Sequence, residues 1–533
     1  MNDLMNEMEG SLMSRLARCL LSLSLAIPAA ESFAGDPGAV TVSVPARTRG
    51  GSWTESHADV PFVGDLSKID TVTFDITISD PSEFFRYRCW FLTARGGKHR
   101  FEFEPEADLS TNQTCHVAFE PRRMRIFGTD DGPGGLKQVV TLRCEALRTA
   151  SSVRGGTVTF SNFRFHLRRP EPTEAESGVA AQRLAQVGGF PGRRGERRLI
   201  WCHSAFGMSE TNGWEASCRL IAESGFTDLI DNLSWGGCAF YDSKVVPRAT
   251  DCPDDMLEDC KAACRRHGLK LHAWRVCWRC NEARSPAAFV EQLKREDRFQ
   301  VSAKGEPQVG WMCPSDPRNQ DLEIAAMVEL AKKGVDGIHF DYIRYPDMQS
   351  CFCANCRRRF ERQVGHPVAK WPKDALLPDG CEHAAWVAFR CANIGRVVES
   401  VSKRVRAECP GVEISVAANS SEATAAESLG QDWPAWCRRG LVDFVCPMDY
   451  HAVPARFARK IVAQRDLLAD TGVKFYPGIG IACSHYPPID ALTAAREIDE
   501  TRRAGLDGFT VFALGTHAQV LLPQLRTGPL RID

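Results

Sequence analysis

Seven glycines, each standing directly before an apolar run, constrain the fold of this chain more than any other feature. In each case a segment of helical character ends in glycine and an extended apolar segment follows at once. The seven are Gly225, Gly268, Gly334, Gly411, Gly440, Gly472 and Gly505. Because glycine readily adopts the left-handed conformation that ends a helix, each one marks a helix-to-strand joint. With an opening strand at 199–202, the pattern predicts eight strands that alternate with helices over residues 198–525.

Eight such units in roughly 320 residues are typical of an α/β fold of the (β/α)8 TIM-barrel type with insertions. A doubly wound open sheet is the alternative, but no glycine-rich phosphate loop follows any of the strands. Two long insertions, at about 276–317 and 347–383, follow the third and fourth strands. Insertions at this end of a barrel are expected to shape a substrate cleft.

The first 34 residues have the features of an export signal. Arg15 and Arg18 precede an apolar stretch at 19–27, and Ser32-Phe33-Ala34 supplies small residues before a predicted cut at Gly35. The residues before Met13 are acidic and fit this pattern poorly, so Met13 is a candidate start. We therefore expect an exported protein, periplasmic or extracellular. No later apolar run is long enough to span a membrane.

Residues 35–168 are predicted to form a β-sandwich, because residues 70–78, 99–103 and 156–165 alternate between apolar and polar side chains. Such a domain could bind carbohydrate through Trp53 or Trp90, or could serve only for packing. Residues 169–197 are rich in proline, glutamate, arginine and glycine and are predicted to be a linker. With 66 basic and 67 acidic residues, the chain has no charge excess that would favour a nucleic-acid partner.

The fourth predicted strand carries the strongest indication of function. Residues 334–346 read Gly-Val-Asp-Gly-Ile-His-Phe-Asp-Tyr-Ile-Arg-Tyr-Pro, and alternation places Gly337, His339 and Asp341 on one face. A carboxylate at the end of a strand is costly to bury against a helix layer but can face a barrel mouth. Barrel enzymes hold their catalytic groups there. Asp341 could instead only pair with Arg344 or cap a helix.

Other strand ends supply further polar and aromatic side chains. Glycoside cleavage requires a protonated acid and a second, ionised group, so Asp341 needs a partner. Asp449, Glu422 and Asp231 are the candidates, although Asp449 could point away from the pocket. Aromatic faces stack on sugar rings, and polar groups orient them. The residues predicted to bind substrate are His272, Trp274, His339, Arg344, Tyr450, Asp231 and Trp235. The two histidines could equally be structural.

These segments resemble the family-10-like glycosyl hydrolases, an exported bacterial group with a TIM-barrel catalytic domain. The matching pieces are 271–274, 334–346, 351–356 and 442–450. The resemblance implies a polysaccharide or oligosaccharide substrate. A more distant similarity is to the chitinases, whose fourth strand carries D-x-x-D-x-D-x-E. Here Ile343 stands at the position of the chitinase acid, so that mechanism does not carry over unchanged.

The chain has 22 cysteines, several of them closely spaced. Cys351, Cys353 and Cys356 follow the fourth strand, and Cys277 and Cys280 follow the third. Because neighbouring strands bring these loops together, four of the five thiols could hold a structural zinc ion. Disulfides are the alternative in an oxidising compartment. No cofactor is expected to be required for catalysis.

The sequence therefore predicts an exported glycoside hydrolase that acts through Asp341 and a second carboxylate. Two alternatives remain open. One is a barrel that binds glycan without cleaving it. The other is a metal-dependent hydrolase or deacetylase that uses His203, His272, His339 and Asp341. Barrel metallohydrolases usually carry a His-x-His pair on the first strand, and His203-Ser204-Ala205 does not supply one.

Overall fold

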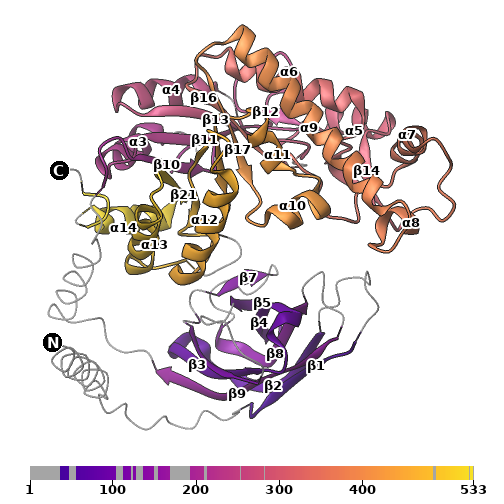
Figure 1. Cartoon of the computed structure of the whole chain (residues 1–533). Helices are drawn as coiled ribbons and strands as arrows, with labels where there is room; N and C mark the ends of the chain where they lie inside the picture. The colour runs from indigo at the N-terminus through magenta and orange to yellow at the C-terminus, as the bar shows by residue number, and fades with distance from the viewer. Residues whose placement is uncertain are drawn as a thin grey trace, which may run out of the picture. The chain divides into compact units, whose positions relative to one another are not determined.

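The computed structural model describes residues 37–46, 56–103, 112–119, 121, 124–127, 136–148, 154–167, 192–208, 213–252, 254–280, 283–483, 488–526 and 528–531. The chain divides near residue 171 into two compact units (Figure 1). The predicted export signal and most of the predicted linker lie outside the described residues. None of the helices in the described ranges has the length and apolar character needed to cross a membrane.

The first unit contains two antiparallel sheets, in the region for which a β-sandwich is expected. Their strand orders are β1-β9-β3-β6 and β2-β8-β4-β5-β7. The strands are β1 (Val40–Val44), β2 (Ser56–Gly64), β3 (Ile69–Ile78), β4 (Phe84–Thr93), β5 (Lys98–Phe103), β6 (Thr114–Phe119), β7 (Arg125–Phe127), β8 (Val139–Arg148) and β9 (Gly156–Leu167). Alternate side chains from both sheets join in one hydrophobic cluster, in which Phe74 and Phe91 are completely buried.

Trp90, one of the two tryptophans considered for sugar binding, takes part in a polar network of this unit. Its indole N–H donates to Glu145 Oε2 at 3.0 Å, and the Arg100 guanidinium lies 5.3 Å from the ring centroid. Trp53 lies outside the described residues. A guanidinium over the indole face is a cation–π contact, so this face of Trp90 is already occupied.

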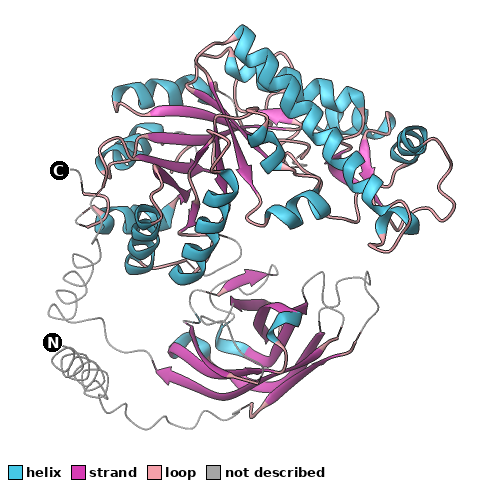
Figure 2. Cartoon of the chain, in the orientation of Figure 1, coloured by secondary structure: helices cyan, strands magenta, loops and turns pink. Residues whose placement is uncertain are grey.

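The second unit is mixed α/β, with helices that follow the strands of a curled parallel sheet (Figure 2). Its strands are β10 (Arg197–Cys202), β11 (Asp228–Trp235), β12 (Cys238–Ala239), β13 (Lys270–Val276), β14 (Phe299–Val301), β15 (Pro307–Met312), β16 (Gly337–Asp341), β17 (Glu413–Ala418), β18 (Phe444–Pro447), β19 (Lys474–Phe475), β20 (Gly478–Gly480) and β21 (Gly508–Leu514). β12 pairs with β11, and β14 with β15 forms a separate hairpin in the first predicted insertion.

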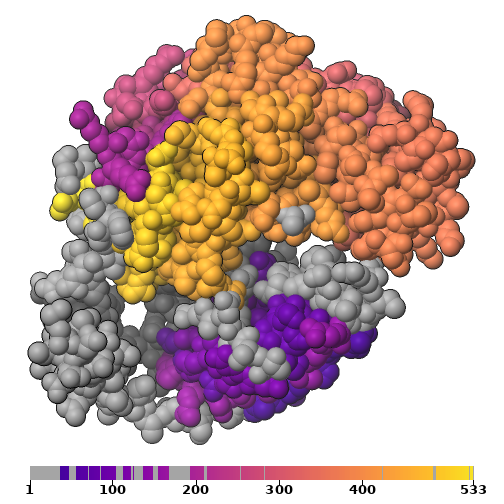
Figure 3. Space-filling model, in the orientation of Figure 1, coloured from indigo at the N-terminus to yellow at the C-terminus, as the bar shows by residue number. Residues whose placement is uncertain are grey.

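The helices of this unit either follow strands of the curled sheet or belong to the insertions after them. They are α3 (Trp214–Glu223), α4 (Met256–Arg266), α5 (Ala287–Arg295), α6 (Pro317–Ala331), α7 (Ala354–Val364), α8 (Lys373–Leu376), α9 (His383–Glu408), α10 (Glu422–Leu429), α11 (Trp433–Arg438), α12 (Pro454–Leu468), α13 (Ala491–Arg503) and α14 (Thr516–Leu525). The helices from α9 onward form a continuous orange-to-yellow surface in the space-filling view (Figure 3). α7 and α8 belong to the second predicted insertion.

The strands of the curled sheet pair in chain order. From β10 the order runs through β11, β13, β16, β17 and β18, and on the other side β10 pairs with β21. The two ends of this order are β19, which pairs with β18, and β20, which pairs with β21, and both belong to the segment 474–480. All these pairings are parallel.

The seven glycines of the sequence pattern have the conformation predicted for them. Each has a positive φ, from 62° at Gly440 to 96° at Gly411. Five of them, Gly268, Gly411, Gly440, Gly472 and Gly505, leave open space around an added Cβ, and Gly334 meets only the end of Lys261 at 3.8 Å. These positions therefore need glycine because of the backbone conformation and not because of crowding.

Alternation along the strands separates two buried layers. Side chains of the inner face form one cluster that includes Trp201, Ile230, Trp274, Phe444 and Tyr476. The opposite side chains, such as Leu229 and Phe340, belong to the larger cluster shared with the helices. The polar column predicted on the fourth strand, Gly337, His339 and Asp341, falls in register with inward-facing His272 and Trp274 of β13.

A buried ion-pair network occupies the amino-terminal end of the inner face. Arg197 Nη2 donates to Asp228 Oδ1 and to Glu413 Oε2, both at 2.6 Å. His272 Nε2 lies 3.0 Å from Asp228 Oδ1. Burial acts to raise the pKa of Asp228, but hydrogen bonds from His272 and Arg197 outweigh it and lower that pKa. One cation thus joins carboxylates from two strands that are not neighbours.

We predict that Arg197→Met destabilises the protein by about 3–5 kcal/mol, because two carboxylates would lose their buried cation. The free energy of unfolding is measured by urea titration with tryptophan fluorescence. Arg219→Met is the matched control, because Arg219 is 57% exposed and its ion pair with Glu215 is long, at 3.9 Å. The control should change stability by less than about 0.5 kcal/mol. Equal effects in the two variants would contradict a central role for Arg197.

Candidate active site

Asp341 ends β16 at the carboxyl end of the sheet and is 5% exposed. Its Oδ1 accepts a hydrogen bond from the Tyr342 backbone N–H at 2.7 Å. Burial raises the pKa of Asp341 from its ordinary value near 3.8 to about 6. The Arg344 guanidinium, the Tyr342 N–H and the Trp274 indole act in the opposite direction without cancelling that effect. This carboxyl group therefore exchanges its proton close to neutral pH.

Aromatic and cationic side chains surround Asp341. Tyr342 has a φ of 51°, which is rare for a bulky residue, and its ring lies 4.5 Å from the Arg344 guanidinium carbon. Trp311 of the β14–β15 hairpin packs against Tyr342 with ring centroids 5.6 Å apart. Both aromatic side chains are only partly buried. The strained backbone at Tyr342 places an aromatic ring beside the carboxyl group, as is common at functional sites.

More aromatic rings gather at the same end of the sheet. The exposed His203 ring, just after β10, packs edge-to-face against Trp274 at 5.4 Å and Trp235 at 6.0 Å. Tyr450 stacks on Phe512 at 5.1 Å. A Cβ at Gly480 would come within 2.8 Å of Tyr450, so glycine lets this ring lie against β20. Of the predicted binding residues, Trp274, Arg344, Tyr450 and Trp235 therefore lie at this end of the sheet.

His272 is corrected to a structural residue. It is completely buried in the Arg197 network at the amino-terminal end of the inner face. It pairs in register with Gly337, whereas Asp341 pairs with Val276, four residues further along β13. A Cβ at Gly337 would lie 2.0 Å from His272 Nδ1, so the imidazole fills the space that glycine leaves. It is out of reach of a substrate at the carboxyl end.

His339 also has a structural position. Its Nε2 accepts a hydrogen bond from the Trp201 indole N–H at 3.0 Å, because an indole can only donate. Nδ1, 2.8 Å from Ser415 Oγ, therefore carries the proton and donates it there. Burial is the main cause that lowers the pKa of His339 well below its ordinary value. The imidazole is neutral and fully occupied, so the prediction that it binds substrate is not supported by this geometry.

Asp231 lies on the outer side of β11, opposite inward-facing Ile230. It is completely buried, and its neighbours are Cys202 and Cys218 of the layer between sheet and helices. Burial raises the pKa of Asp231 well above its ordinary value. The side chain is thus away from the inner face, and its predicted roles in binding or as partner of Asp341 are corrected.

Asp449 and Glu422 both contact helix α12. Gln464 of that helix donates to Asp449 Oδ1 at 2.9 Å, and burial raises the pKa of this completely buried aspartate to about 7. Glu422, at the start of α10, accepts from Lys460 Nζ at 3.2 Å and is 38% exposed. Asp449 therefore points to the helix layer, and Glu422 is the more accessible of the two.

Among the described residues, none of the groups that shift the pKa of Asp341 is a carboxylate. The second carboxylate of the predicted pair is therefore not brought into contact with it in the described part of the chain. The four residues of the metallohydrolase alternative also do not converge, since His272 lies at the far end and both nitrogens of His339 are occupied.

Two groups in the described residues have the spacing to hold a metal ion. Asp228, His272 and Glu413 form one, but the Arg197 guanidinium already supplies the cation there. The other is Cys313, Cys351, Cys353 and Cys356. Cys277 and Cys280, predicted as metal ligands, are buried elsewhere, and their inclusion is corrected.

Sequence reasoning missed three residues at these sites. Tyr342 follows Asp341 directly and could have been found from that position alone. Trp311 belongs to the β14–β15 hairpin, which is inserted after β13, and Cys313 directly follows that hairpin. Nothing in their spacing indicates that the hairpin folds back towards the end of β16.

We predict that Asp341→Asn stabilises the protein at alkaline pH. A raised folded-state pKa means that the protonated carboxyl contributes stability that is complete below about pH 4 and is lost as pH rises through about 6. A shift of about two pKa units corresponds to about 3 kcal/mol. The variant, which cannot ionise, should therefore exceed the wild type at pH 8 and approach it near pH 4.

Thermal unfolding at pH 4, 6 and 8 checks this prediction. Asp470→Asn, at an exposed aspartate after α12, is the matched control and should show no such pH-dependent difference. A lower melting temperature for Asp341→Asn than for the wild type at pH 8 would contradict the raised pKa.

Comparison with known proteins gives a family and a set of similar folds. Residues 209–486 match the family described as glycosyl hydrolase-like 10. The glycoside hydrolase domain of PgaB (BpsB) from Bordetella bronchiseptica is similar in structure, with 13% identity and a TM-score of 0.49 over 63% of this chain and 99% of that one. The catalytic domain of a β-amylase from Paenibacillus polymyxa has 11% identity and a TM-score of 0.44 over 62% and 94%.

No curated protein matches the sequence. The family match confirms the resemblance stated from the sequence, and it includes β11 through β20 with Asp341. Because the matched residues make up just over half of the chain, the protein belongs to the glycosyl hydrolase-like 10 family.

Proposed function

We propose that this protein is a glycoside hydrolase in which Asp341 is the general acid, held at the mouth of a (β/α)8 barrel. The observation that carries the proposal is a buried carboxyl with a pKa of about 6, at the carboxyl end of a parallel strand. A general acid must be protonated before the reaction and able to release its proton during it. A carboxyl with its pKa raised by burial meets both requirements near neutral pH.

Arg344 and the aromatic rings give this carboxyl a suitable setting for a sugar. Tyr342 and Trp311, which are both only partly buried, present aromatic faces of the kind that pack on sugar rings, whereas Trp274 is 3% exposed. Arg344 lowers the pKa of Asp341, so it would stabilise the carboxylate left after proton transfer to the leaving oxygen. The substrate class would be a polysaccharide or oligosaccharide, met outside the cytoplasm if the predicted export signal acts.

The second catalytic group is proposed to be Glu422. It begins α10 just after β17, the strand that pairs with β16, and its carboxylate is partly exposed. Asp449 is completely buried against Gln464 and would need to move to reach a sugar. A general base placed about 6.5–9.5 Å from the acid would direct a water molecule in an inverting reaction.

Reducing-end release from a panel of polysaccharides, including peptidoglycan, tests the role of Asp341. We predict that Asp341→Asn lowers kcat at least 100-fold, since general acid catalysis contributes roughly 10²–10⁴-fold. In the wild type, kcat/KM should fall above an apparent pKa of about 6, as the acid loses its proton. Asp470→Asn is the control. Equal activity in Asp341→Asn and wild type would overturn this assignment.

A barrel that binds glycan without cleaving it is the second candidate function. The observation in its favour is that no described carboxylate contributes to the pKa of Asp341. Both candidate functions require the aromatic wall formed by Trp311 and Tyr342. Trp311→Ala should therefore weaken glycan binding, or raise KM, roughly 2- to 10-fold, because an aromatic contact contributes about 0.5–1.5 kcal/mol. Binding is measured by isothermal titration calorimetry. Affinity with no turnover in the wild type would favour the binding function.

A further inference from the structure

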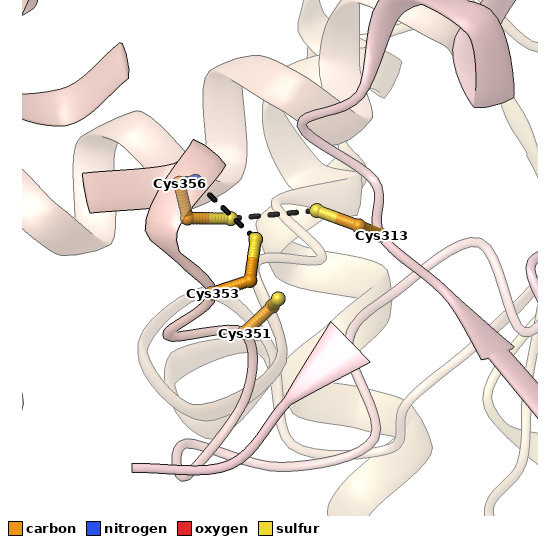
Figure 4. Close-up of side chains that lie close together, drawn as sticks. All are labelled: Cys313, Cys351, Cys353 and Cys356. Carbon is orange, nitrogen blue, oxygen red and sulfur yellow. Dashed lines mark hydrogen bonds between the residues drawn. The ribbon is translucent and has the colours of Figure 1, made fainter. Parts of the chain in front are cut away.

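Four buried cysteines meet beside the hairpin that carries Trp311 (Figure 4). Cys313 lies between β15 and α6, Cys351 and Cys353 lie in the loop before α7, and Cys356 lies in the first turn of α7. Their exposed fractions are 0–8%. Two chain segments that carry these cysteines also carry residues of the candidate active site. The loop that begins with Tyr342 continues to Cys351, and Trp311 precedes Cys313 by two residues.

We propose that Cys313, Cys351, Cys353 and Cys356 bind one Zn²⁺ ion. All four sulfur atoms lie within 4.8 Å of one another, and Cys313 Sγ is 3.4 Å from Cys356 Sγ. Tetrahedral zinc with Zn–S bonds of about 2.3 Å places its sulfurs about 3.8 Å apart. The cluster is therefore close to the size that the ion requires, and its four ligand atoms are all sulfur, which favours zinc over a harder metal. The Ser315 hydroxyl lies 3.0 Å from Cys356 Sγ, at hydrogen-bond distance from this sulfur.

The groups around the cluster suit thiolates better than thiols. The Val301 backbone N–H donates to Cys351 Sγ at 3.4 Å, and the Cys356 N–H donates to Cys353 Sγ at 3.3 Å. Cys353 is the N-cap of α7, so the positive end of an eleven-residue helix faces the sulfurs. Outer hydrogen bonds of this kind orient metal ligands and stabilise their charged form.

A buried arginine supplies independent support. Arg390 of α9 is 1% exposed, and among the described residues its guanidinium donates to the backbone oxygens of Glu427, Asp347 and Ser428. Within the described residues no carboxylate is close enough to form an ion pair with it, and the groups that interact with it electrostatically include Cys391, the more distant Asp347 carboxylate and Cys356. A guanidinium buried without a counter-charge is costly. Zinc with four thiolates carries a net charge of −2, which would compensate it.

The ion would connect two separate insertions, which follow the neighbouring strands β13 and β16. Cys313 follows the β14–β15 hairpin, whereas the other three follow β16. Four thiolates saturate zinc, so the site would stabilise the fold and would not activate water. Its structural effect would be to hold Trp311 against Tyr342, at the edge of the candidate active site.

Metal content and cobalt spectroscopy of the full chain test this proposal. The wild type, produced with zinc in the medium, should contain one zinc per chain by plasma mass spectrometry. Cobalt exchanged into the site should give the intense visible bands of tetrahedral thiolate coordination. Cys313→Ser should contain less than a tenth of the wild-type zinc and should not give the cobalt–thiolate bands. Cys277→Ser is the matched control, because Cys277 is equally buried and lies outside the cluster, and it should keep the metal.

Two further measurements separate loss of metal from loss of fold. Far-ultraviolet circular dichroism should show both variants folded, and zinc added to the wild type after chelation should restore the melting temperature. If Cys313→Ser does not fold, Cys351→Ser takes its place. Wild-type protein without metal whose four cluster cysteines resist thiol reagents until they are reduced would be disulfide-bonded and would overturn the proposal. Iron in place of zinc, or full metal content in Cys313→Ser, would also overturn it.

Discussion

Every polar group on the inner face of the curled sheet must find a partner, because burying it alone would cost more than the fold can supply. At the amino-terminal end Arg197 meets this requirement by binding Asp228 and Glu413. In the middle, the Trp201 indole and Ser415 occupy both nitrogens of His339. At the carboxyl end the compensation is weaker. There Asp341 is buried without a paired cation close enough to restore its ordinary pKa.

Polar groups at the amino-terminal end of the strands are therefore held in place by partners, whereas the carboxyl group at the other end can still exchange a proton. His272 and Asp341 both point inward from neighbouring strands, but one is fixed in an ion-pair network and the other retains an exchangeable proton. The Tyr342 backbone, held at a φ of 51°, places its ring beside that proton. A substrate that brings a leaving oxygen to Asp341 would therefore meet a prepared acid, and the network at the far end would keep the strand in place.

Local sequence patterns predict the sheet well because they act over one helix-to-strand joint at a time. Gly334 and its six counterparts take positive φ as expected, and β10, from Arg197 to Cys202, contains the predicted opening strand at 199–202. The same patterns do not state which side of a strand faces inward. Asp231 lies within β11 and Asp449 just after β18, yet both carboxyls are buried towards the helices, beside Cys202 and Gln464 respectively. Alternation fixes relative sides, and only tertiary packing decides between them.

The cysteine cluster shows the same limit over a longer range. Cys351, Cys353 and Cys356 are close in sequence, so their proximity follows from one loop and one helix turn. The identity of the fourth cysteine depends on where an inserted hairpin folds. From sequence alone, Cys277 and Cys280 are the predicted ligands, because they follow the neighbouring strand. The hairpin instead turns so that Trp311 packs on Tyr342, and Cys313 follows it to the cluster. If one ion closes this junction, the aromatic wall of the site and the thiolate cluster form a single unit. A substitution that removes either contact would then loosen the other.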